Sequence, residues 1–256
     1  MRGSRRVRTG LGWLAMAIAA CHPALLHAQS KNINGALALS SQLVDRGLAI
    51  TPATLAVQGA ISWTSPAGWS LGLSGGTEVR APGRITQTLI QGSRYWPLSG
   101  DWQLQANLLY YRYSGRTGWT AYDHGEAGFN WIYRDILTFG LSAIRIIGVE
   151  NQRVHAAADL NVHWPLTEHV SVSAGAGVAH APPPRYNRYP DSWGYDRERP
   201  YRHDSGSFYR YGHAGLLWVS GPWRVELDRV MTDLGSRRST RDLSAQPWMA
   251  TISRSF

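Results

Sequence analysis

Apolar and polar residues alternate along many short segments of this chain. Over residues 102–108, tryptophan, leucine and alanine alternate with glutamine and asparagine, and the same period of two recurs over 155–164, 170–178 and 223–228. Successive side chains of a β-strand point to opposite faces of the sheet. Each of these segments therefore predicts a strand with one apolar face and one polar face.

The whole pattern predicts an all-β chain. After residue 28 there is no run of about 18 apolar residues and no long apolar stripe at the helical period, which argues against membrane-spanning helices. We expect about twelve strands, with roughly 10 to 14 compatible with the pattern. They are predicted near residues 33–45, 53–64, 69–79, 84–96, 102–114, 120–133, 136–148, 155–164, 169–180, 206–219, 222–231 and 246–256.

The connections between these strands alternate in length. Every second one is very short: "SPAG", "PLSGD", "RD", "PLTE" and "SGP". The others are mostly longer and cover residues 46–52, 80–83, 115–119, 149–154, 181–205 and 232–245. Outer-membrane barrels combine short periplasmic turns with longer outward loops, whereas a soluble sandwich has no reason to sort its loops in this way. The sequence thus predicts a transmembrane up-and-down antiparallel β-barrel with both termini at the periplasmic side.

Tryptophans cluster beside the short connections. An aromatic ring with an apolar body and a polar edge suits the headgroup layer of a membrane. We therefore expect an interfacial ring, although Trp and Tyr also favour strand ends in other β proteins. Its predicted members, joined by Tyr133, are Trp63, Trp69, Trp96, Trp102, Trp131, Trp164, Trp218 and Trp223.

The first 28 residues have the layout of a secretory signal. Four arginines precede an apolar run over residues 11–20, and small residues follow near "LLHAQS". We expect cleavage after Ala28 and a barrel domain over residues 29–256. The alternative is lipid attachment at Cys21 within "IAAC". Removal of residues 1–28 lowers the net charge from +9 to +5, because that segment holds four arginines and no acid, and so modest an excess does not indicate a nucleic-acid partner.

The chain ends in "QPWMATISRSF". Phe256 follows Ile252, Ala250 and Trp248 at alternate positions, and this ending resembles the last strand of bacterial outer-membrane proteins, which implies recognition by the barrel insertion machinery. Arg254 breaks the apolar alternation, but an interfacial arginine can extend its head to phosphate.

Two other segments fit the alternation poorly. Gln87 and Gln91 share the parity of Ile85, and Arg145 shares that of Leu141. A bulge, or a strand end above the membrane, would explain either irregularity.

Residues 40–75, "SSQLVDRGLAITPATLAVQGAISWTSPAGWSLGLSG", resemble the opening of the TorF porin family of proteobacterial outer-membrane proteins. The residues that carry the resemblance are Arg46, Gly47, Pro52, Gln58, Gly59, Gly68 and Trp69. The family has aromatic residues where this chain has Asp45 and Leu43. The resemblance implies a small barrel with pore activity and names no substrate.

The polar face of the strands supplies candidates for a pore lining. Ionisable groups inside a membrane are costly unless they face water or one another. The candidates are Ser74, Glu78, Gln103, Gln105, Asn107, Glu126, Asn130, Asp159, Asn161, His163, Arg224, Glu226 and Asp228. We expect a narrow passage for small hydrophilic solutes across a bacterial outer membrane. The alternative is a closed structural or surface-interaction barrel whose lumen is cross-linked by Arg–Glu pairs.

The segment 182–206 is rich in proline, arginine, tyrosine and aspartate and lacks a strand period. It predicts a solvated outer loop. Alternatively, its arginines bind lipopolysaccharide phosphates or fold inward to constrict the pore. These arginines are Arg185, Arg188, Arg197, Arg199 and Arg202.

Catalytic and metal sites have weak support. Neighbouring residues in "RHDSGS" (His203, Asp204, Ser205 and Ser207) and in "YDHGE" (Asp123, His124 and Glu126) could serve an outer-membrane lipid hydrolase. A catalytic triad is recognised by geometry, however, and the chain has no GxSxG elbow. It also lacks a GxGxxG motif and a P-loop. We expect no enzyme activity, no metal and no cofactor.

Overall fold

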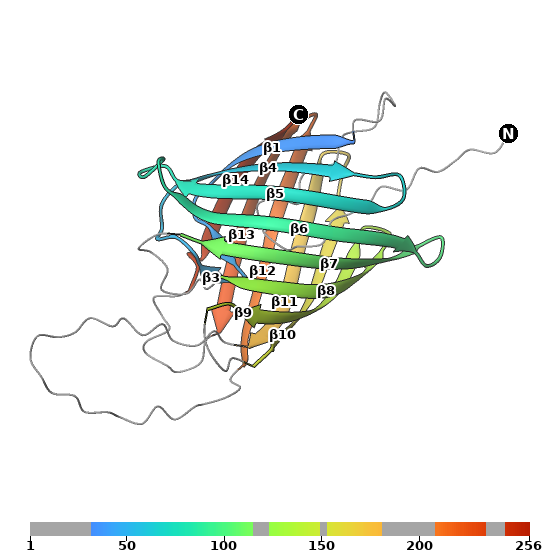
Figure 1. The fold of residues 1–256 in the computed structure, drawn as a ribbon. Helices are drawn as coiled ribbons and strands as arrows, with labels where there is room; N and C mark the ends of the chain where they lie inside the picture. Colours follow the sequence, from blue (N-terminus) through green and yellow to red (C-terminus); the bar gives the residue numbers. More distant parts are fainter. Residues whose placement is uncertain (1–31, 115–122, 149–152, 181–207, 234–243) are drawn as a thin grey trace, which may run out of the picture.

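The computed structural model describes residues 32–114, 123–148, 153–180, 208–233 and 244–256. Within these ranges, twelve antiparallel strands form a closed barrel, and two short strands form a separate hairpin (Figure 1). The barrel strands are β1 (Ile33–Ser40), β4 (Ala56–Thr64), β5 (Trp69–Glu78), β6 (Ile85–Pro97), β7 (Trp102–Tyr113), β8 (His124–Tyr133), β9 (Leu137–Ile146), β10 (His155–Pro165), β11 (Val170–His180), β12 (Phe208–Ser220), β13 (Trp223–Asp233) and β14 (Trp248–Ser255). The hairpin strands are β2 (Val44–Asp45) and β3 (Leu48–Ala49).

Each barrel strand pairs with its neighbours in sequence, and β1 closes the cylinder. β1 pairs with β14 from Ala36↔Ser255 to Ser40↔Thr251, and on its other edge it pairs with β4. The backbone groups of Gly35 and Phe256 bond to each other in both directions at 3.0 Å. Among the described residues, no strand of the barrel has an open edge, as a structure that crosses lipid requires. The predicted up-and-down barrel of about twelve strands is confirmed.

Apolar side chains cover the outside of the barrel. Large hydrophobic residues on the outward parity, such as Leu108 and Leu227, are exposed, while their polar neighbours Asn107 and Asp228 are buried. This inverts the arrangement of a soluble protein and is the expected result of facing lipid. None of the described residues forms a helix long and apolar enough to span a bilayer.

The eight predicted interface tryptophans lie at or near the strand ends beside the short turns. Trp102 packs against Tyr133 with ring centroids 5.0 Å apart. The Arg94 guanidinium lies 4.8 Å from the Trp69 ring centroid and 5.2 Å from that of Trp96. These arginine–aromatic contacts put a cation beside the aromatic ring, a favourable arrangement at a polar membrane edge.

The structure explains both segments that fit the apolar–polar alternation poorly. A register shift between Gly76 and Thr77 marks a bulge against the start of β6, so that Ile85 faces outward while Gln87 and Leu89 face the lumen. Arg145 faces outward near the loop end of β9. At the other membrane edge, the guanidinium of Arg254 lies 5.5 Å from the ring centroid of Trp223.

The prediction for the first strand was wrong. β1 ends at Ser40 rather than at residue 45, and the segment predicted as an outward loop over 46–52 instead belongs to a hairpin inside the barrel. Asp45 and Leu48 pair across a two-residue turn in which Arg46 (φ 46°) and Gly47 (φ 75°) both have positive φ. Two positive φ values are the signature of the type I′ turn, which joins strands tightly.

Candidate functional site: a lumen narrowed by an inner hairpin

Residues 43–50, here called the inner hairpin, fill part of the barrel lumen. Their apolar side chains pack against the inner wall in three clusters. Leu43 and Ile50 contact Ala56, and Val44 packs with Val230 and Met249. Leu48 packs with Ala157, Ala179 and Tyr209 on three successive strands. The hairpin therefore makes apolar contacts with widely separated parts of the wall and is held in place by burial.

The hairpin tip is anchored to β13. The carbonyl oxygen of Gly47 accepts a hydrogen bond from Thr232 Oγ1 at 2.8 Å and another from the backbone N–H of Ala245 at 3.0 Å. A β-carbon at Gly47 would collide with the hydroxyl of Thr232 and meet the side chain of Tyr211. Glycine is thus required at this position by both its backbone angle and its surroundings.

We predict that Gly47→Ala destabilises the barrel by about 1–3 kcal/mol, the range for a non-glycine residue held in an unfavourable backbone region. Guanidinium-induced unfolding in lipid vesicles measures the loss. Gly100→Ala is the matched control, because a β-carbon there meets no atom within 4 Å. Equal stability of the two variants would contradict the packing described for the tip.

Arg46 reaches across the lumen to the opposite wall. Its guanidinium donates to Glu126 on β8 at 2.6 and 3.1 Å, and it also donates to Ser142 Oγ on β9 at 3.2 Å. The exposed fraction of the side chain is 9% for Arg46 and 0% for Glu126. This is a buried bidentate pair, so removal of one partner leaves an uncompensated charge.

Aromatic and acidic groups complete this side of the lumen. The hydroxyl of Tyr211 donates to the carboxylate of Asp159 across Gly177, whose missing side chain leaves room for the tyrosine ring. Tyr111 stacks on His124 with ring centroids 4.5 Å apart, and Tyr113 lies beside both. The wall facing Arg46 is therefore densely packed.

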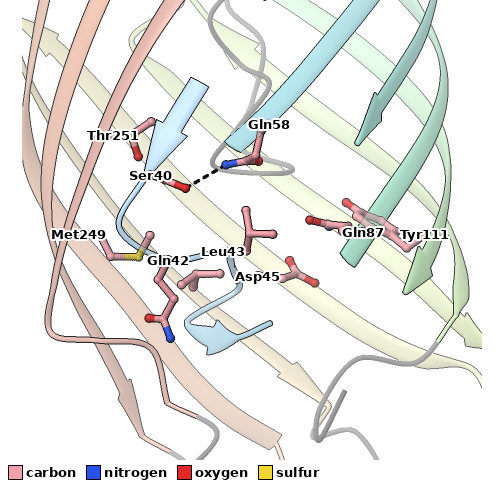
Figure 2. A pocket seen from close by; sticks show the side chains of 10 residues that line it. Ser40, Gln42, Leu43, Asp45, Gln58, Gln87, Tyr111, Met249 and Thr251 are labelled. Carbon is pink, nitrogen blue, oxygen red and sulfur yellow. Dashed lines mark hydrogen bonds between the residues drawn. The ribbon is translucent and has the colours of Figure 1, made fainter. Parts of the chain in front are cut away.

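A pocket remains beside the inner hairpin and extends from Tyr111 on β7 to β14. Figure 2 shows side chains from the hairpin, β4, β6, β7 and β14 pointing into one space inside the barrel. Seven of the ten lining residues carry an amide, hydroxyl or carboxylate group, which suits a hydrated solute. The lining residues are Ser40, Gln42, Leu43, Val44, Asp45, Gln58, Gln87, Tyr111, Met249 and Thr251.

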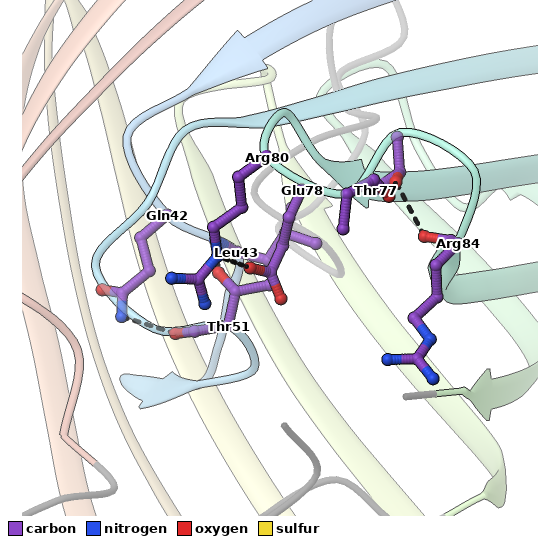
Figure 3. Close-up of polar contacts among 8 residues, drawn as sticks. Gln42, Leu43, Thr51, Thr77, Glu78, Arg80 and Arg84 are labelled. Carbon is purple, nitrogen blue, oxygen red and sulfur yellow. Dashed lines mark hydrogen bonds and ion pairs between the residues drawn. The ribbon is translucent and has the colours of Figure 1, made fainter. Parts of the chain in front are cut away.

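Polar contacts hold the segment where it enters and leaves the lumen (Figure 3). Gln42 Nε2 donates to the carbonyl oxygen of Thr51 at 2.8 Å, and the N–H of Leu43 donates to Thr51 Oγ1 at 3.0 Å. Close by, Arg80 Nε donates to Glu78 Oε2 at 2.7 Å. The two ends of the inner hairpin are thus fixed to each other at the loop side of the barrel.

The predicted pore-lining residues all lie on the inward parity of their strands. Glu78, Gln105, Asn107, Glu126, Asn130, Asn161, Glu226 and Asp228 are buried, and Gln103, Asp159, His163 and Arg224 are partly exposed. They do not form one site. Glu78 lies at the loop-side mouth, Glu126 binds the inner hairpin, and Asn130 Nδ2 donates to Gln105 Oε1 at 3.0 Å farther along the wall.

The residues of the TorF-like motif lie in separate parts of the structure. Gln58 lines the pocket and donates to Ser40 Oγ at 3.1 Å, while Gly59 faces outward beside Leu37. Gly68 (φ 83°) makes a short turn, and Pro52 is exposed. Arg46 and Gly47, by contrast, form the hairpin tip. An Arg-Gly pair between short apolar stretches was the available sequence signal for this turn.

The other candidates do not assemble into a reactive site within the described residues. Asp123 Oδ1 accepts from the backbone N–H of Tyr113 at 2.8 Å and so ends a strand. His203, Asp204, Ser205, Ser207 and the five arginines of segment 182–206 lie outside the described residues, as do Cys21 and Ala28. No group of three His, Cys, Asp or Glu residues in the described ranges is placed to hold a metal ion.

At the turn side, an exposed ion pair joins two short turns. Arg134 Nε donates to Asp101 Oδ1 at 2.8 Å, and this hydrogen bond lowers the pKa of the Asp101 carboxyl below its ordinary value. Such pairs contribute little to stability because water screens them.

Solved porins have a similar fold. The structure of the NanC porin matches this chain with a TM-score of 0.50 and 10% identity, covering 88% of this chain and 98% of that one. The KdgM porin matches with a TM-score of 0.50 and 8% identity, covering 87% and 98%. The sequence matches no protein-family model and no curated protein. The comparisons show a porin-like barrel fold, and they leave membership of the TorF family as a hypothesis.

Proposed function

We propose that this protein is a narrow channel that passes small hydrophilic solutes across the bacterial outer membrane. The polar pocket beside the inner hairpin carries the proposal, because packed side chains of the described residues leave this space in the lumen open. Twelve strands enclose more space than an eight-stranded barrel, whose interior side chains can fill. The likeness of the fold to solved porins supports the same conclusion.

The proposed path runs along one side of the inner hairpin only. On the β8–β9 side, the Arg46–Glu126 pair joins the hairpin to the wall. On the β4–β6 and β14 side, the wall presents Gln58, Gln87 and Thr251 to the pocket. A solute would therefore pass between the hairpin and this second wall, where polar side chains can replace part of its hydration shell.

A closed structural barrel is the second candidate. The apolar contacts of Val44 and Leu48 with the wall favour it, because they fill much of the lumen at the level of the hairpin. In that case the buried polar groups would cross-link the interior instead of lining a passage.

Liposome swelling separates the two functions. Vesicles that contain the purified protein are expected to admit small sugars such as arabinose and to exclude oligosaccharides, because the pocket is narrow. Empty vesicles are the control. Absence of swelling with any solute would support the closed barrel and overturn the channel.

We also infer that the outward arginines near the loop end bind lipopolysaccharide phosphates. Arg112 and Arg145 are exposed, and Tyr110, Gly125 and Arg145 share one row of paired residues across β7, β8 and β9. No partner for either guanidinium is found among the described residues. An arginine at the membrane edge favours contact with an anionic lipid headgroup.

We predict that the double variant Arg112→Ala/Arg145→Ala retains less lipopolysaccharide after purification in mild detergent than the native protein does. Arg134→Ala, at the turn side, should retain the native amount. Native mass spectrometry with added lipid A measures the difference. Equal retention by the two variants would contradict a specific site.

The exposed C-terminal Phe256 supports a further partner. Its backbone is paired with Gly35, and the residue is 75% exposed, with its ring lying over Gly35. We propose that this ring is read by the barrel insertion machinery during assembly and then closes the seam next to β1.

A further inference from the structure

The open side of the inner hairpin carries negative charge. Asp45 lines the pocket from the hairpin, and the pocket residues Met249 and Thr251 on β14 are paired with Asp228 and Glu226 on β13. Asp45, Glu226 and Asp228 are here called the acidic strip. Because Glu226 and Asp228 are two residues apart, they face the same side of β13, the lumen.

Two arginines of this region are each paired with a carboxylate. Arg46, beside Asp45 in the sequence, points to the opposite wall and is neutralised there by Glu126. Arg224 Nη2 donates to Glu226 Oε2 at 3.2 Å and so compensates one member of the strip. Among the described residues, the pocket lining thus holds one carboxylate, Asp45, and no cation, and β13 adds Asp228 beside the lining residue Met249.

One oxygen of the strip lacks a partner. The Glu226 side chain is 6% exposed, and its Oε1 atom is buried without a hydrogen-bond donor among the described residues. Asp228 Oδ1, two residues away, accepts a long hydrogen bond from Ser173 Oγ at 3.4 Å, and the Asp228 carboxyl also contacts that of Glu226. Two neighbouring carboxylates inside a lumen favour the binding of a positive charge when some of their oxygens have no hydrogen-bond donor.

We propose that the acidic strip is a binding site for small cations on the conduction path, and that the channel passes cations in preference to anions. This inference rests on the proposed channel function and defines its solute class. A cation entering beside the hairpin meets Asp45 first and then Asp228 and Glu226. An anion is repelled by the same carboxylates, and no guanidinium group lies among the described residues that line the pocket.

Reversal potentials in planar bilayers test the proposal. In a KCl gradient the native protein is expected to show K⁺ selectivity over Cl⁻. Glu226→Gln/Asp228→Asn should lower the permeability ratio by roughly fivefold or more, because each of the two lost unit charges acts with about 1 kcal/mol at about 4 Å in water, which is about fivefold. Glu168→Gln, an exposed carboxylate in a turn away from the lumen, should leave the ratio unchanged.

The possible outcomes separate this inference from the channel function. Conductance with a preference for Cl⁻, or a permeability ratio that the double variant does not change, would overturn the cation site and leave the channel intact. No conductance at all would overturn the channel and the site together. If the double variant does not fold, as judged by its heat-modifiable mobility in electrophoresis, Asp45→Asn provides the same comparison from the hairpin side.

Discussion

Excision of the inner hairpin is expected to raise the single-channel conductance to several times that of the intact protein. The hairpin can be removed with little strain, because the N–H of Ile50 already donates to the carbonyl oxygen of Leu43 at 2.9 Å. Residues 44–49 can therefore be replaced by two glycines, which form a two-residue turn. Glu126→Gln is combined with the excision so that no buried charge remains unpaired.

Planar-bilayer recording measures this effect. Pro52→Gly/Ala53→Gly is the matched control, since both residues are exposed in the same segment and do not fill the lumen. The control should conduct like the native protein. A hairpin-free barrel with native conductance would show that the hairpin does not limit the passage.

Glu126→Leu is expected to lower the free energy of unfolding by about 3–5 kcal/mol, the usual cost of breaking a buried ion pair from one side. The cause is the Arg46 guanidinium, which loses both of its bonds to the carboxylate and retains only Ser142. If the hairpin leaves the lumen to hydrate Arg46, the measured loss becomes smaller and the conductance rises.

Guanidinium unfolding in vesicles measures the loss, and a second variant isolates its cause. Arg46→Met/Glu126→Leu removes both charges and should recover most of the stability, because apolar residues of similar size can replace a buried pair. Asp101→Asn, which breaks the exposed pair with Arg134, should change little. A double variant as unstable as the single one would assign the effect to packing rather than to charge.

The sequence was sufficient to predict the barrel because period-two alternation and loop sorting are repeated along the whole chain. Apart from the end of β1, the barrel strands lie where the alternation indicated, within a few residues, and the polar parity is the inward one. The strand signal of each segment is weak by itself, but its repetition along the whole chain makes the prediction of a barrel robust.

The inner hairpin was missed because its residues continue the pattern of the strand before it. Leu43 and Val44 extend the apolar character of β1, so the alternation gives no sign that the chain leaves the wall at Ser40. What fixes the hairpin inside is tertiary contact, above all Arg46 with Glu126, 80 residues away. A contact of that separation leaves no local trace in the sequence.

The bulge next to β6 shows an intermediate case. The mixed parity of Ile85 and Gln87 indicated an irregularity, but a bulge and a strand end were equally compatible with it. The register of β5 against β6 shows that the irregularity is a bulge. The bulge turns Leu89 inward, where it packs with Leu109 and Tyr111.

The central claim is that the polar face of the strands lines an aqueous path while the apolar face contacts lipid. Thr251 and Ile252 are adjacent on β14 and test it directly, since Thr251 lines the pocket and Ile252 is exposed on the outside. In a Cys21→Ser background, a charged thiosulfonate reagent should label Thr251→Cys and leave Ile252→Cys unlabelled in vesicles. Labelling of Ile252→Cys with protection of Thr251→Cys would contradict the account.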